Sequence, residues 1–194
     1  DRTDDVRPGQ FDTLSSSVSR SVMAAALVAG GSLLPGASVA YGQAATNVTL
    51  SGQQTTTQAI TGSPVIVTTA PLFGVDTTSG QAISIGSSGG TSFTDANRST
   101  ITGQLTGIAV NNTTSGLVTI TTNGIVTSRS SSGISAFSTA PDGITISAAT
   151  VSGFFDGITA TGPGTMSITA TGTVTGTTAR GVNATSAGGG TGLT

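Results

Sequence analysis

The sequence predicts an all-β protein: a parallel β-helix, or solenoid, with coils of about 24 residues and three short strands in each coil, preceded by a signal-peptide segment. Three observations predict this fold. Short aliphatic segments recur in a fixed order, β-branched residues dominate these segments, and residues 1–40 differ in composition from the rest. Long helices are not expected beyond residue 45, because Gly, Ser, Thr and Asn are poor helix formers.

Residues 1–40 are predicted to be an extended or incomplete signal peptide region. Their apolar core, residues 23–34, is too short to span a bilayer, which takes about 20 residues. It has the length of the apolar centre of a signal peptide, and small residues before Tyr41 and again before Ala45 fit cleavage sites. We therefore expect an exported chain that begins near one of these two positions. A short buried helix is the alternative interpretation.

The next segment, residues 41–79, is predicted to be an atypical first coil or cap. It repeats least clearly, although Val48-Thr49-Leu50 and Val65-Ile66-Val67 have the composition of strands. Residues 80–194 are predicted to form regular β-helix coils, truncated at the C-terminal end.

Three series of short segments define the repeat in residues 80–194. The first places a Gly before an aliphatic residue and a small one, at Gly107-Ile108, Gly133-Ile134, Gly157-Ile158 and Gly181-Val182, with Gly80-Gln81-Ala82-Ile83 upstream. The second centres on Ile120, Ile146 and Ile168, and the third on Ile101, Val126, Val151 and Val174. The three series keep the same order in every cycle, as three strands per coil would.

Each segment alternates aliphatic residues with Thr or Ser, which is the period of a strand with one buried face. Successive coils would lie about 4.8 Å apart, so residues 46–194 would form roughly six coils in a rod on the order of 30 Å long. Like positions should then stack. We expect one buried stack of Ile108, Ile134, Ile158 and Val182, and another of Ile120, Ile146 and Ile168.

Two other architectures fit the pattern less well. A β-sandwich would show hairpin turns and no fixed three-part order. Tracts rich in Ser, Thr and Gly are often disordered linkers, but a linker has no reason to keep its aliphatic residues in phase.

The coils resemble the amino-terminal part of an autotransporter passenger domain from a Gram-negative bacterium. The stretches that carry this resemblance are Gly157-Ile158-Thr159-Ala160, Thr171-Gly172-Thr173-Val174-Thr175-Gly176 and Arg180-Gly181-Val182-Asn183-Ala184, together with the signal-peptide region. The resemblance implies a secreted or cell-surface structural or adhesin-type protein. It also implies an outer-membrane barrel in the same polypeptide as partner, which this chain lacks, and host or surface ligands of unknown identity.

The composition excludes most catalytic and binding chemistry. The chain has no His, Cys, Lys or Glu, so the usual activated nucleophiles are missing, and no catalytic, cofactor-binding or metal-binding residue is predicted. A net charge of −2 with six Arg gives no basic footprint for nucleic acid. We therefore expect that this segment is not an enzyme.

Only Asp76, Asp95, Asp142 and Asp156 could act as acids or bases after residue 40. Asp142 and Asp156 each precede a Gly, which is a turn signal, and they belong to different series, so we expect them at different corners. Asp156 and Arg180 both precede a Gly that opens a first-series segment. We expect these two residues in one slot on adjacent coils, where their side chains could pair.

Two alternative functions remain open at this level. One is part of a polysaccharide hydrolase or lyase whose catalytic residues lie outside this segment. The other is ice binding by an outward hydroxyl ladder, at Thr119-Ile120-Thr121, Thr145-Ile146-Ser147 and Ser167-Ile168-Thr169. Thr is also simply a favoured outward strand residue, which explains the same ladder without any ligand.

Overall fold

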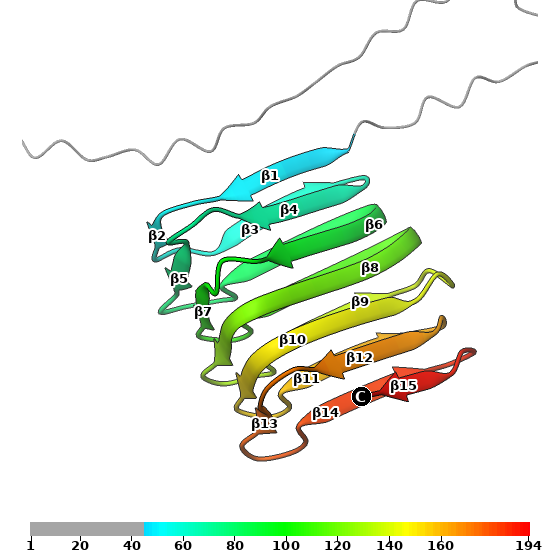
Figure 1. Ribbon diagram of the computed structural model, residues 1–194. Coiled ribbons are helices and arrows are strands. Elements are labelled where there is room, and N and C mark those ends of the chain that lie inside the picture. Colours follow the sequence, from blue (N-terminus) through cyan, green and yellow to red (C-terminus); the bar gives the residue numbers. More distant parts are fainter. Residues whose placement is uncertain (1–44) are drawn as a thin grey trace, which may run out of the picture.

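The computed structural model describes residues 45–194, which form a parallel β-solenoid of about 6 turns (Figure 1). The expected signal-peptide region, residues 1–40, lies outside the described residues. The strands are β1 (Thr46–Leu50), β2 (Gln53–Gln54), β3 (Gln58–Gly62), β4 (Val65–Thr69), β5 (Gly74–Asp76), β6 (Ile83–Asp95), β7 (Thr100–Gly103), β8 (Ile108–Ser128), β9 (Ile134–Ser138), β10 (Ile144–Gly153), β11 (Ile158–Gly162), β12 (Met166–Ala170), β13 (Val174–Gly176), β14 (Val182–Ser186) and β15 (Thr191–Leu193).

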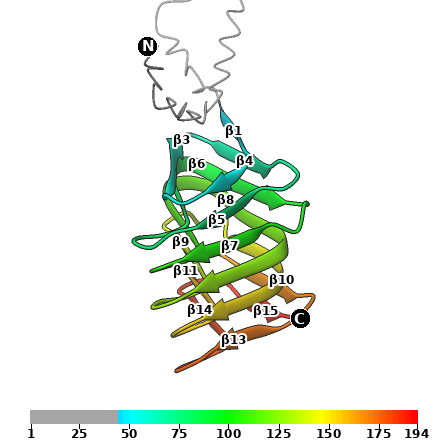
Figure 2. The same cartoon turned by 90° about the vertical axis from the view of Figure 1, so that its left-hand side faces the viewer.

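The strands lie on three faces, which we name A, B and C. Face A follows the order β1-β4-β6-β8-β10-β12-β15. Face B consists of β3, β9, β11 and β14 with the first parts of β6 and β8, and face C of β2, β5, β7 and β13 with the last parts of β8 and β10. Every pairing is parallel, and Figure 2 shows the coils stacked along the rod. The predicted three strands per coil are confirmed.

Coil length averages about 25 residues, close to the expected 24, but it is not constant. The offset between paired positions is 19 residues for Thr49 and Thr68 on the first two coils and 27 for Asp95 and Thr122. The ladder shifts register near Gly89 and between Ala148 and Thr150. Extra residues are therefore absorbed at corners and bulges, where they do not disturb the stacking of buried positions.

The stacking expected from the sequence is confirmed. Ile108, Ile134 and Ile158 pair in register and are fully buried, and Val182 continues the stack in a partly buried position. Ile120, Ile146 and Ile168 form the second buried stack, which Phe93 and Val67 extend toward the N-terminal end. The third series also pairs in register, in the order Ile101, Val126, Val151 and Val174.

One equivalence predicted from the repeat pattern is wrong. The sequence pattern matched Gly80 to Gly107, but in the structure Ile83 pairs with Ile108, so Ala82 occupies the position of Gly107. Gly80 instead lies in the preceding corner with a φ of 74°. Buried aliphatic side chains set the register, because they fill the core, whereas a corner can lengthen or shorten without cost to packing.

Gly143, in the corner between β9 and β10, offers a test of coil spacing. It has a φ of 97°, and a Cβ there would overlap the backbone carbonyl oxygen of Thr165 on the next coil. We expect Gly143→Ala to cost about 1–3 kcal/mol of unfolding free energy, because it adds backbone strain and pushes two coils apart. Thermal unfolding followed by circular dichroism would measure this loss.

Gly52→Ala is the matched control for that substitution. Gly52 also has a positive φ, 68°, but a Cβ there would meet only the end of the Gln54 side chain at 3.9 Å. It should show the strain without the overlap, and therefore a smaller decrease in melting temperature. Equal decreases for the two variants would show that close coil contact at Gly143 contributes nothing.

Candidate functional site

The four carboxylates of the described residues are dispersed over the solenoid. Asp76 ends β5 and Asp95 ends β6, whereas Asp142 and Asp156 lie in the corners before and after β10. The different corners expected for Asp142 and Asp156 are thus what the structure has. Each carboxylate is hydrogen-bonded to its own partners rather than to another carboxylate. Within residues 45–194, no group of three or more Asp residues is placed to hold a metal ion.

Asp76 and Arg129 form a bidentate ion pair that crosses two coils. Arg129 Nη1 lies 2.7 Å from Asp76 Oδ1, and Nη2 lies 3.0 Å from Oδ2. The hydrogen bond from Arg129 lowers the pKa of Asp76 and raises that of Arg129. Both side chains are exposed, so the pair is expected to add little stability. The sequence pattern does not reveal this pair, because the partners are 53 residues apart and lie two coils from each other.

Asp156 and Arg180 lie on adjacent coils, 24 residues apart, as the sequence predicts. The ladder beside them pairs Ile158 with Val182. The contact differs from the expected pairing of side chains. The Arg180 backbone N–H, not its guanidinium, donates a hydrogen bond to Asp156 Oδ1 at 3.0 Å. Oδ2 accepts hydrogen bonds from the side chains of Asn183 at 3.1 Å and Thr159 at 3.3 Å.

This environment shifts the ionisation of Asp156. Partial burial opposes the charged form, but the hydrogen bonds from Asn183, the Arg180 backbone and Thr159 outweigh it, so the pKa of Asp156 lies below its usual value. A carboxyl whose pKa is lowered by folding stabilises the fold above its unfolded-state pKa of about 3.9. That contribution is lost as the pH falls through the lowered pKa. Asp156 therefore links two adjacent coils at this corner through its hydrogen bonds.

Asp95 is fully buried and is the centre of a polar cluster inside the solenoid. Its carboxylate accepts hydrogen bonds from the hydroxyls of Thr69 at 2.8 Å and Ser99 at 2.8 Å, and from Thr122 at 3.2 Å. The backbone N–H groups of Asn97 and Ser99 each donate to it at 3.1 Å. A carboxylate so fully satisfied binds three coils together and has little capacity left for a ligand.

Face A carries a continuous outward row of hydroxyl residues, which we name the hydroxyl row. Its members pair in register along the rod: Thr49, Thr68, Thr94, Thr121, Ser147, Thr169 and Thr194. Thr49 and Thr68 are hydrogen-bonded to each other through their Oγ1 atoms at 3.2 Å, as are Thr169 and Thr194 at 3.1 Å. The hydroxyl ladder expected from the sequence is therefore present and uncharged.

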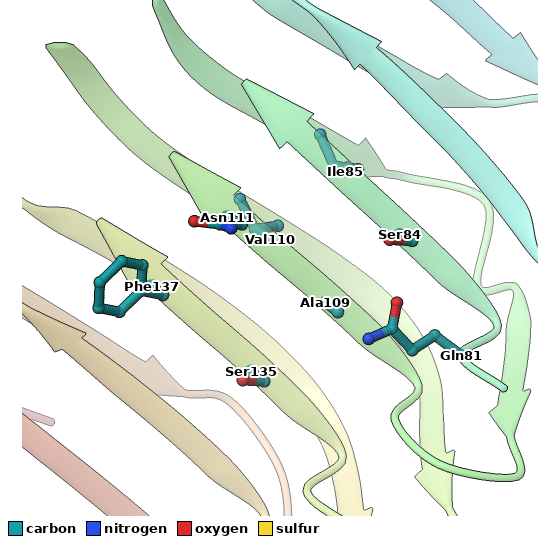
Figure 3. A pocket seen from close by; sticks show the side chains of 8 residues that line it. All are labelled: Gln81, Ser84, Ile85, Ala109, Val110, Asn111, Ser135 and Phe137. Carbon is teal, nitrogen blue, oxygen red and sulfur yellow. The ribbon is translucent and has the colours of Figure 1, made fainter. Parts of the chain in front are cut away.

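Face B carries a shallow depression of about 320 Å³ across β6, β8 and β9 (Figure 3). The outward side chains that line it are Gln81, Ser84, Ala109, Asn111, Ser135 and Phe137, with Ile85 and Val110 from the inward positions. Phe137 and Gln81 lie at opposite ends of the labelled group in Figure 3. The sequence pattern alone does not mark these residues as a site. Their only sequence signal is an aromatic residue at an outward strand position, where Ser or Thr usually stands.

Comparison with models of protein families, with curated proteins and with solved structures finds no match to this chain. The β-solenoid is established by the structure alone, and no family or homologue identifies an autotransporter. In the part of the chain that the structure describes, no helix is long and apolar enough to cross a membrane.

Proposed function

We propose that this solenoid is a rod section of a Gram-negative autotransporter passenger, with a structural or adhesin-type role at the cell surface and no catalytic activity of its own. The observation that carries the proposal is the continuous parallel ladder that joins every coil to the next, on all three faces. Such a rod is held together by backbone pairing and stacked aliphatic residues, without disulfides. It holds its lateral surface in a fixed shape.

The character of that surface supports the same proposal. The hydroxyl row on face A is neutral, and the Asp residues are dispersed among corner and interior hydrogen bonds. A polysaccharide hydrolase needs paired carboxylates roughly 5–10 Å apart on one surface. Dispersed carboxylates and a regular face that carries an uncharged hydroxyl row fit display and spacing better than bond cleavage.

Surface display tests the proposal directly. The full gene would be expressed in a Gram-negative host with an epitope inserted at the exposed Asn123, and intact cells would be labelled with antibody. We expect labelling without lysis, and an exported chain whose N-terminus, measured by mass spectrometry, lies near Tyr41 or Ala45. Deletion of residues 1–40 should abolish the label. Labelling that requires lysis in the undeleted protein would contradict the proposal.

A further inference from the structure

We infer that the depression on face B is a subsite for an uncharged sugar ring of an oligosaccharide, an inference that rests on the proposed adhesin-type role and names its ligand class. Five of the side chains that line the depression belong to residues that pair in register on adjacent coils. Asn111 on β8 pairs with Phe137 on β9, and Ser84, Ala109 and Ser135 pair along the neighbouring outward row. The ladder therefore holds all five side chains at fixed spacing, so little ordering is needed on binding.

The depression exists because small residues stand beside large ones. Gly86 precedes Asn111 in the same outward row, and a Cβ there would meet only the Thr61 Cγ2 at 3.5 Å. Ala109 lies in the next outward row, and its small side chain leaves the bottom of the depression open. Phe137 stands above this floor with 43% of its surface exposed. The volume is near the lower end of the range for small-molecule sites, about 300–1,000 Å³, which suits one ring of a longer ligand.

The lining has the two chemistries that a sugar ring requires. An exposed aromatic face packs against ring C–H groups, and side-chain amides both donate to and accept from hydroxyls. Within residues 45–194, the side-chain amides of Gln81 and Asn111 make no hydrogen bond to another protein group, and neither do the hydroxyls of Ser84 and Ser135. The bond that Thr57 donates to Gln81 goes to the backbone carbonyl oxygen and leaves the amide free. These four polar groups are therefore free to exchange water for ligand hydroxyls without breaking internal bonds.

The uncharged lining of the depression and the strand pairing of face B argue against charged sugars and extended peptides as ligands. No Asp or Arg lines the depression, so a sulfated or sialylated sugar would lose hydration without gaining a counter-charge. An extended peptide usually docks by pairing with a free strand edge. Here β6, β8 and β9 are each paired on both sides within face B, so no edge is offered. A neutral oligosaccharide fits both conditions.

The test uses the purified full chain on an array of neutral hexose and N-acetylhexosamine oligosaccharides, with sialylated and sulfated sugars beside them. We expect binding to neutral sugars only, weakened about tenfold or more by Phe137→Ala and preserved by Phe137→Trp. Ala109→Leu, which fills the depression without removing the ring, should also abolish binding. Phe155→Ala is the control, because Phe155 is 51% exposed at a corner away from the depression, and it should bind as the parent does.

Absence of neutral-sugar binding, preference for charged sugars, or unchanged binding by both Phe137→Ala and Ala109→Leu would overturn the inference. Circular dichroism of each variant separates loss of the site from loss of the fold. Because the array uses purified protein, its result is independent of localisation. Sugar binding without surface display would refute only the proposed location, and display without sugar binding would refute only the subsite.

Discussion

Ile146→Asp should destabilise the solenoid by about 4–5 kcal/mol, enough to disrupt its central coils. Ile146 is fully buried between Ile120 and Ile168, its register partners on the two adjacent coils. A carboxylate in this stack would lose its hydration and face aliphatic side chains above and below. Urea unfolding followed by circular dichroism would show a large decrease in the midpoint, and the loss should be smaller at acid pH, where the carboxyl is neutral.

Thr145→Asp is the control for this substitution. Thr145 is the preceding residue on β10 and points outward from face A, where it is half-buried beside Thr119 and Ser167. A charge there remains in contact with water, so we expect a loss of about 1 kcal/mol or less. Similar losses for the two variants would show that the inward and outward assignment on β10 is wrong.

The repeat could be predicted from the sequence because packing and pattern coincide in a solenoid. Each coil must bury its aliphatic residues against the next coil, so Ile120, Ile146 and Ile168 recur in phase along the chain. The same recurrence puts Asp156 and Arg180 at equivalent positions on adjacent coils. Glycines were a poorer guide, as Gly80 shows, because they mark corners whose lengths vary.

The polar contacts could not be predicted in the same way. Asp95 resembles a turn residue in sequence, yet it is buried, because Thr69 and Thr122 on the adjacent coils supply its donors. Those partners are 26 and 27 residues away, and many Thr residues in the chain have similar spacing. Likewise, Phe137 is a candidate ligand contact only because the register places it beside Asn111. Long-range register, not local sequence, decides which polar and aromatic groups meet.

Asp95→Ala should cost about 3–5 kcal/mol of unfolding free energy, although it removes a charge from the interior. The substitution leaves the hydroxyls of Thr69 and Thr122 and the backbone N–H groups that point at Asp95 without an acceptor. The site is fully buried, so solvent is not there to replace the carboxylate. Urea unfolding would measure the loss, and hydrogen exchange should accelerate at the amides of Asn97 and Ser99, which lose their acceptor.

Two further variants separate the hydrogen-bonding role of Asp95 from its charge. Asp95→Asn keeps one acceptor oxygen but turns an NH₂ group toward donors. Its free energy of unfolding should therefore lie between those of the parent protein and Asp95→Ala. Asp142→Ala removes an exposed carboxylate whose contact is the backbone N–H of Gly116 at 2.7 Å, and it should cost about 1 kcal/mol or less. If Asp95→Ala were as mild as Asp142→Ala, the buried cluster would not hold the three coils together.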